Sequence, residues 1–586
     1  MSVILRYTVS MPQPTNHLFE ITATIAADIG PVIDWVMPVW TPGSYMVREY
    51  SRHVQELQVL TPDGSKLSAT KIAKNHWQID NPQQGEVQVR YRLYANDLTV
   101  RTNHLDQTHG YFNGAATFFY IPDYLNHPIE VTIDLPQPNW AIATALPQIG
   151  AQKFLAQDFD QLVDSPFEMG LQTQIDFEVM GKPHKYAIWG KGDLDVTALI
   201  ADTTRIIETE AKLFGGLPYE QYLFILHLNK GYGGLEHKDS TSLLFSRTGF
   251  KKRETYEDFL TLVAHEFFHL WNVKRIRPKA LEVFDYTCEN YTPSLWFSEG
   301  ATSFYDNVIP MRAGIYSPQT YLKNFSKSIT RYLSTIGRKI QPLSESSFDA
   351  WIKLYRPDAN SSNSQMSYYL KGEMVTFLLD LSIRKRHQNH RSFDDVMRSL
   401  WDEFGREEVG FTPEQLQQTI EHIAGFDLTA FFKQYIDGLE ELPFEAILND
   451  FGLTLVSNLD AQSGSGKLSP YLGLRLATEQ GKTIVKAVAS GSPGELAGLD
   501  AGDELVAIDG LRVTVDQLNE RLQYSQPGDL LEVSYFHQDE LLQTLIKLDE
   551  PQATQFSIKL LPEPTAAATA LLEGWLGIPY DTLSSL

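Results

Sequence analysis

The chain has 586 residues, a formal net charge of -24, 43% hydrophobic residues and 21% charged residues. Its length excludes a single small module and predicts three or four domains, at roughly 150 residues each. The composition excludes a disordered or fibrous protein, and the acidic charge disfavours nucleic acid and membranes as partners, because like charges repel.

The first region, residues 1–170, has a hydrophobic period of two. Apolar residues alternate with polar ones at 19–25, 87–93 and 129–135, which is typical of strands with one buried face. Turn residues such as those at 62–64 separate these runs. We predict an N-terminal antiparallel β-sandwich domain over 1–170, without chemistry of its own.

The pattern then changes to helical periods. A helical stretch at 197–214 precedes the apolar run 222–226, and long helical periods follow from 255 to about 455. We predict a mainly helical second domain over 171–456. Residues 457–466 have a linker composition, and a third domain of short strands is predicted over 457–555. A helical tail at 556–586, with an alanine-rich helix from about Thr565, completes the chain.

The most informative motif is HExxH at residues 265–269. The preceding segment has helical spacing, with Thr255 as its predicted N-cap. Positions i and i+4 share one face of a helix, so His265 and His269 can bind one metal, with Glu266 beside the metal-bound water. A bare HExxH also occurs by chance, and helix histidines are often packing residues, so the motif alone leaves both interpretations open.

A third ligand is available at Glu299. It lies on a second predicted helix that begins near Pro293, among aromatic residues where an unpaired carboxylate would be costly. Two histidines and a glutamate leave the fourth zinc position for water, whose pKa falls toward ~7, so Glu266 can act as its general base. Asp306, two turns later on the same face, could accept the outer N–H of a ligating histidine. The alternative for Glu299 is a solvated helix residue.

Residues 265–278, HEFFHLWNVKRIRP, resemble the extended HExxHxWNxKRxRP signature of the glycyl aminopeptidase family. These PDZ-containing gluzincin zinc metallopeptidases are also called metallopeptidase family sixty-one. The resemblance extends over nearly the whole chain, at 40–45, 296–300, 368–372, a PDZ-like segment and 574–577. It implies a multidomain α+β fold: a β-domain, a thermolysin-like catalytic domain and a C-terminal PDZ domain. It also implies one Zn2+ per chain and removal of N-terminal residues, with glycine or alanine favoured.

The resemblance also assigns roles to single residues. Carried over by motif, the zinc ligands are His265, His269 and Glu299, and the general base is Glu266. Related aminopeptidases place an oxyanion-binding tyrosine two residues before a Lys-Gly pair, the position that Tyr369 holds. Tyr368 is the alternative donor, and both tyrosines could instead be core aromatics.

Residues 231–237 precede the helix of the HExxH motif, here called the metal helix. At the same position those aminopeptidases carry a GxMEN motif on an edge strand. Glu236 matches its glutamate and is predicted to bind the substrate α-ammonium through a charge-assisted hydrogen bond. The sequence departs from the motif at Leu235 and His237, and a plain β-turn is the alternative.

Three basic residues follow the metal helix at Lys274, Arg275 and Arg277. They could orient the Glu299 region or bind a substrate carboxylate, and a structural ion-pair role is the alternative. The sequence does not separate these roles.

The C-terminal module has the pattern of a bacterial PDZ domain at 492–510, and Leu472, Gly473 and Leu474 match its carboxylate-binding loop. In such modules backbone N–H groups bind the terminal carboxylate of a peptide, which adds a strand. Peptide C-termini are therefore predicted partners. The alternative is a degenerate copy that only packs against the catalytic domain.

The single cysteine, Cys288, cannot form an internal disulfide, which favours the cytoplasm. No signal peptide and no run of ~18 apolar residues is seen, so we expect no membrane association.

Three functions remain open. The first is a zinc aminopeptidase acting on peptides with a small N-terminal residue. The second is a zinc endopeptidase of broader specificity, and the third is a PDZ-type binding protein with a vestigial metal site. Manganese or cobalt could also occupy the same ligands.

Overall fold

The computed structural model describes residues 3–460 and 468–583. The chain divides into two units. Unit 1 comprises Met1–Tyr291, Val308–Ile315 and Leu400–Thr412. Unit 2 comprises Thr292–Asn307, Tyr316–Ser399 and Pro413–Leu586.

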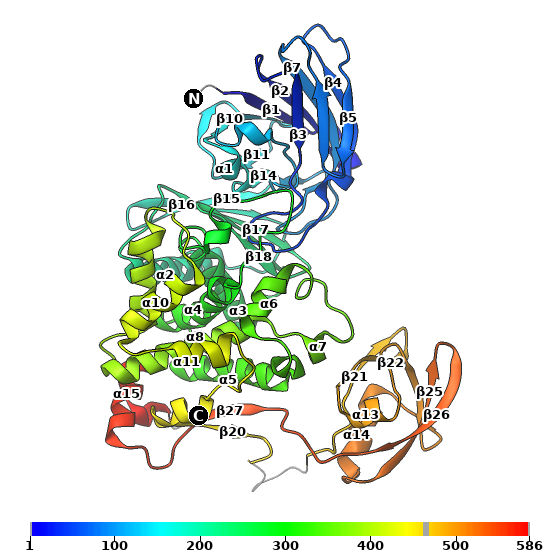
Figure 1. The fold of residues 1–586 in the computed structure, drawn as a ribbon, viewed down its shortest axis with the longest axis vertical. Helices are drawn as coiled ribbons and strands as arrows, with labels where there is room; N and C mark the ends of the chain where they lie inside the picture. Colours follow the sequence, from blue (N-terminus) through cyan, green and yellow to red (C-terminus); the bar gives the residue numbers. More distant parts are fainter. Residues whose placement is uncertain (1–2, 461–467, 584–586) are drawn as a thin grey trace. The chain divides into compact units, whose positions relative to one another are not determined.

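Unit 1 begins with three β-sheets (Figure 1). Their strand orders are β12-β13-β10-β1-β2-β7-β4, β11-β14-β9-β8 and β3-β6-β5. The strands are β1 Leu5–Ser10, β2 Leu18–Ile25, β3 Val32–Val36, β4 Val54–Leu60, β5 Ala69–Ala73, β6 His76–Asp80, β7 Val87–Tyr94, β8 His104–Leu105, β9 His109–Phe112, β10 Ile129–Asp134, β11 Ala141–Ala143, β12 Gln148–Gly150, β13 Lys153–Ala156 and β14 Phe167–Gly170.

The predicted alternation is confirmed in these sheets. In β2 every second side chain from Phe19 to Ile25 is buried, and the polar residues between them are partly exposed. One pair differs from the predicted antiparallel arrangement, because β1 and β10 run parallel. A parallel pair needs a long crossover, and the chain from β2 to β9 supplies it.

The second part of unit 1 is a five-stranded sheet of order β15-β16-β17-β19-β18, accompanied by helices. Its elements are β15 Thr173–Val179, β16 Lys182–Trp189, β17 Tyr222–Asn229, β18 Gly233–Glu236, β19 Ser240–Ser246, α2 Val196–Phe214 and α3 Arg253–Phe268. Helix α1, Phe159–Val163, precedes β14 and packs in the core of the N-terminal sheets. Strand β18 lies at the edge of the sheet, antiparallel to β19. The predicted N-cap of α3 is wrong: the helix starts at Arg253, and the Thr255 hydroxyl donates to the carbonyl of Lys252 at 3.0 Å.

Residues 292–449 are mainly helical, and together with the β-sheets they confirm the α+β fold class. The helices are α4 Thr302–Arg312, α5 Pro318–Ser334, α6 Leu343–Phe348, α7 Ser361–Ser364, α8 Tyr368–His387, α9 Phe393–Leu400, α10 Pro413–Ala424, α11 Thr429–Phe431 and α12 Phe444–Asn449. Helix α8 is buried along most of its length, and its N-cap Ser367 accepts the N–H of Leu370 at 3.4 Å.

The PDZ-like segment lies between two paired strands, β20 Leu453–Ser457 and β27 Phe556–Leu560. Its elements are β21 Leu474–Glu479, β22 Lys482–Val488, α13 Pro493–Leu496, β23 Glu504–Ile508, β24 Leu511–Arg512, α14 Val515–Tyr524, β25 Leu530–His537 and β26 Glu540–Lys547. The segment expected as a helical tail therefore begins with a strand, and helix α15 Ala566–Leu576 follows its N-cap Thr565. Most of the expected linker at 457–466 lies outside the described residues. No helix in the described part of the chain is long and apolar enough to cross a membrane.

Candidate active site

The two histidines of the HExxH motif lie at the C-terminal end of α3. Their Nε2 atoms are 3.0 Å apart, close to the roughly 3.3 Å separation expected for two ligands of one tetrahedral zinc ion. The Nδ1 atom of His269 lies 2.6 Å from the backbone carbonyl of Asn272. A carbonyl only accepts hydrogen bonds, so Nδ1 carries the proton and the lone pair of Nε2 is available for a metal. The donor set of α3 thus fits zinc.

The Glu266 carboxylate lies beside these histidines and is only 5% exposed. Its Oε2 atom has no hydrogen-bond partner among the described residues. Burial raises the pKa of this carboxyl above its usual range, while the neighbouring His265 and His269 oppose the rise. A Cβ at Gly234 would lie 2.1 Å from Oε1, so only glycine lets strand β18 approach this closely.

Glu236, at the end of β18, lies close to the same place. One ligand atom each of Glu236, Glu266 and His269 lie within 4.8 Å of one another. Glu236 is 4% exposed, and its Oε1 atom has no partner among the described residues. A buried carboxylate oxygen without a donor is costly, which makes it suitable for receiving a ligand ammonium.

Two loop residues of the N-terminal region, Arg101 and Gly43, contact this site, while the expectation that the region carries no chemistry of its own stays a prediction. Arg101 donates from Nη2 to the carbonyl of Gly234 at 3.0 Å, and its charge helps to lower the pKa of Glu266. Gly43, with φ +84°, packs against Glu236, since a Cβ there would lie 2.5 Å from both carboxylate oxygens. Sequence reasoning missed Arg101, because an isolated loop arginine 133 positions from its partner belongs to no motif.

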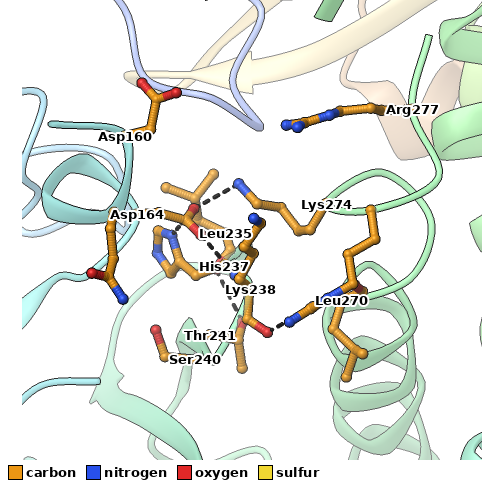
Figure 2. Close-up of polar contacts among 12 residues, drawn as sticks. Asp160, Asp164, Leu235, His237, Lys238, Ser240, Thr241, Leu270, Lys274 and Arg277 are labelled. Carbon is orange, nitrogen blue, oxygen red and sulfur yellow. Dashed lines mark hydrogen bonds and ion pairs between the residues drawn. The ribbon is translucent and has the colours of Figure 1, made fainter. Parts of the chain in front are cut away.

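The basic residues after α3 form structural contacts rather than an open anion site. Lys274 donates to Asp164 at 2.6 Å, and His237 Nδ1 lies 3.1 Å from the same carboxylate oxygen. Figure 2 shows Asp164 between the two side chains. Arg275 donates to the carbonyl of Leu270 at 2.9 Å. This network ties the end of the metal helix to His237, the residue after Glu236.

Arg277 joins a second ion pair, with its Nη2 atom 3.7 Å from Glu408. Lys238 Nζ lies 2.5 Å from the same carboxylate. The structure thus favours the ion-pair alternative for the basic residues.

We predict that Asp164→Asn destabilises the protein by about 3–5 kcal/mol at pH 7, because it leaves Lys274 buried without its counter-charge. Burial raises the pKa of Asp164, but Lys274 and His237 together hold it well below its usual range. A lowered folded-state pKa stabilises above the unfolded value of about 4, and this stability is lost as the pH falls further. The deficit should therefore shrink below pH ~4 in urea unfolding.

The control for this prediction is Asp176→Asn, which removes an exposed pair with Lys185 at 3.4 Å. It should change the unfolding midpoint little at any pH. A deficit for Asp164→Asn that is equal at pH 7 and pH 3 would contradict the ion-pair interpretation.

In unit 2, Glu299 lies on a π-helical turn, Trp296–Ala301, and is 2% exposed. Such turns occur frequently at functional sites. A Cβ at Gly300 would lie 2.4 Å from the Cα of Gly372, so two glycines let this turn pack directly on α8. The packing brings Glu299 near the first turn of α8, since Glu299 contributes to the raised pKa of Tyr369.

Tyr369 and Tyr368 occupy different environments. Tyr368 is fully buried, and its hydroxyl donates to Tyr355 at 3.2 Å. Tyr369 is half-buried, its hydroxyl lies 2.9 Å from that of Tyr355, and burial followed by Glu299 raises its pKa well above the usual range. The geometry favours Tyr369 as the phenol that meets a ligand. Tyr355 was missed, because nothing in its segment marks it.

Asp306 lies on α4 and is 8% exposed. Its Oδ1 atom accepts a hydrogen bond from Asn307 Nδ2 at 2.8 Å. Its charge helps to raise the pKa of buried Glu373, after burial itself. The contact with a ligating histidine stays a prediction.

The PDZ-like module presents the predicted loop beside a cavity of about 1020 Å³. Gly473 has φ +78°, and a Cβ there would lie 2.1 Å from the Cβ of Ser492. Leucines and a valine of β21 and α14 line the cavity: Leu474, Leu476, Val515, Leu518 and Leu522. These are the positions at which an added peptide strand would contact such a module.

Three family models match the chain: Peptidase M61 N-terminal domain at residues 6–171, M61 glycyl aminopeptidase at 258–375 and PDZ domain at 470–548. An aminopeptidase N family protein from Idiomarina loihiensis is 31% identical with a TM-score of 0.91, covering 98% of this chain and 100% of that chain. An M1 zinc metallopeptidase from Deinococcus radiodurans is 14% identical with a TM-score of 0.48, covering 75% of this chain and 94% of that chain. No curated protein matches the chain.

Proposed function

Because the chain belongs to the M61 glycyl aminopeptidase family and is a metallopeptidase of the aminopeptidase type, we propose that it removes N-terminal residues from peptides with one active-site zinc ion. The proposed ligands are His265, His269 and Glu299. The observation that carries the proposal is the convergence of the two Nε2 atoms at 3.0 Å beside the buried Glu266. When bound there, zinc supplies a Lewis acid that polarises the peptide carbonyl and acidifies water.

The residues of the chain would act in a defined order. Glu266, whose buried carboxylate lies beside the two histidines, takes the proton of the attacking water. Glu266 then returns the proton to the leaving amine. Tyr369 donates a hydrogen bond to the developing oxyanion, and Asp306 is proposed to orient a ligating histidine.

Glu236 is proposed to bind the α-ammonium of the substrate, which makes the enzyme an exopeptidase. A preference for glycine or alanine at the substrate N-terminus is proposed from the match to the M61 glycyl aminopeptidase model.

The test is hydrolysis of aminoacyl reporter amides, free and N-acetylated, with chelator and with zinc added back. Release from free glycyl and alanyl reporters that stops with chelator and returns with zinc is expected. Cleavage of the N-acetylated reporters at equal rates would instead identify an endopeptidase.

Glu236→Ala is predicted to lower kcat/KM for free-amine reporters by about 10²-fold, because a charge-assisted hydrogen bond to the ammonium is lost. The residual rate on N-acetylated reporters should not change, because they carry no ammonium. The matched control is Glu220→Gln, an exposed glutamate on the same unit. An equal loss on both reporter types would exclude the amine-binding role.

We further propose that peptide C-termini bind the PDZ-like module through Leu472, Gly473 and Leu474, supported by the cavity that side chains of β21 and α14 line. A cytoplasmic location agrees with the single cysteine.

A further inference from the structure

A second cluster of metal-ligating side chains lies on the β8–β9 hairpin, away from the HExxH motif in the sequence. One ligand atom each of His104, Asp106 and His109 lie within 4.8 Å of one another. The hairpin turn fixes Asp106, because its Oδ1 atom accepts the N–H groups of Thr108 at 2.7 Å and His109 at 3.1 Å. Its other oxygen, Oδ2, is left facing His104 Nε2 at 3.4 Å.

His109 has the environment of a metal-ligating histidine. Its side chain is fully buried, and Trp189 stacks on its ring with centroids 3.7 Å apart. Nδ1 lies 3.0 Å from Glu168 Oε1, while Nε2 is buried without a hydrogen-bond partner among the described residues. A carboxylate that accepts from Nδ1 fixes the tautomer in which Nε2 carries the lone pair, the arrangement commonly found behind metal-bound histidines.

The carboxylate behind His109 is itself held firmly. Glu168 is fully buried on β14, and its second oxygen lies 2.9 Å from Nε2 of His227 on β17. The hairpin is thereby connected through two histidines to a central strand of the five-stranded sheet. A buried polar atom without a partner needs an explanation such as a bound ion, and Nε2 of His109 is such an atom.

We propose that His104, Asp106 and His109 bind a second divalent transition-metal ion, with Glu168 positioning His109. Two imidazoles and one carboxylate suit Zn2+ or a similar borderline ion, and water would complete the coordination. An ion can enter from solvent, since the side chains of His104 and Asp106 are 15% and 33% exposed. The three ligands occupy one hairpin and include no general base, so the ion stabilises the fold and does not catalyse.

The test uses the full chain with His265→Ala and His269→Ala, which removes the active-site ligand pair. After dialysis against Zn2+, elemental analysis should find one ion per chain in this variant and two in the unaltered protein. Adding Asp106→Asn should weaken zinc binding at the remaining site at least about tenfold, because the carboxylate charge of the ligand is lost. The asparagine Oδ1 can still accept the N–H groups of the hairpin turn, so the turn itself should be kept. Zinc should raise the melting temperature of the double variant and not of the triple variant.

His76→Gln is the matched control, because His76 also pairs with an aspartate, Asp34, at 2.8 Å. It should leave the metal content unchanged. No zinc in the double variant, or zinc that persists undiminished after Asp106→Asn, would overturn the proposal. If Asp106→Asn fails to fold, His104→Gln tests the same ligand set. A content of one zinc ion per chain in the unaltered protein would also count against the proposal.

Discussion

Replacing Glu266 by glutamine is expected to lower kcat by about 10²–10⁴-fold while the zinc content and KM stay unchanged. Glutamine has nearly the same shape and fills the same buried space beside Gly234, but it cannot take a proton from water. The histidine Nε2 atoms, which are 3.0 Å apart, are not altered by this substitution, so the metal ligands stay in place. Steady-state kinetics on glycyl reporters, combined with elemental analysis, measures both quantities.

The control for this variant is Glu254→Gln, an exposed glutamate at the other end of α3. It should retain full activity. Unchanged turnover in Glu266→Gln would remove Glu266 as the base, whereas a parallel loss of zinc would show that its carboxylate maintains the metal site instead. Unchanged turnover would be decisive, because the other two polar residues of the HExxH motif are the proposed metal ligands and cannot also act as the base.

The histidine pair could be predicted from sequence because it depends on local geometry alone. Residues i and i+4 share a face on any α-helix, so His265 and His269 converge whatever the rest of the fold does. The edge position of Glu236 is instead implied by the resemblance of residues 231–237 to the GxMEN motif of related aminopeptidases, and the structure places it at the end of edge strand β18. The alternation of apolar and polar residues, as from Phe19 to Ile25, similarly makes the β-strands of the N-terminal region predictable.

Other parts of the site depend on contacts that no local pattern records. Arg101 reaches Gly234 from a loop, and its position follows from the packing of whole sheets. The π-helical turn at Glu299 has only six residues, too few for a periodic pattern to distinguish it from an α-helix. Strand β27, which follows the PDZ-like segment, pairs with β20, which precedes it. This pairing joins residues about 100 positions apart, and no local pattern predicts it.

The choice between the adjacent tyrosines is of the same kind, because successive helix residues point about 100° apart and the sequence does not fix the rotation of the helix. In the structure Tyr368 faces the protein interior, and Tyr369 is half-buried near Glu299. Both hydroxyls contact Tyr355, so hydrogen bonding to protein does not distinguish them. The partial exposure of Tyr369 and its proximity to Glu299 distinguish it from Tyr368.

Tyr369→Phe is therefore expected to lower kcat by about 10²–10³-fold with little change in KM, because the lost hydrogen bond forms only as charge develops on the oxyanion. The raised pKa of Tyr369 keeps the phenol protonated, so the effect should be constant across neutral pH. Tyr368→Phe, one residue away in the same helix turn, is the matched control and should lose less than about threefold. A larger loss in Tyr368→Phe than in Tyr369→Phe would exchange their roles, and equal small losses would assign oxyanion stabilisation to the metal alone.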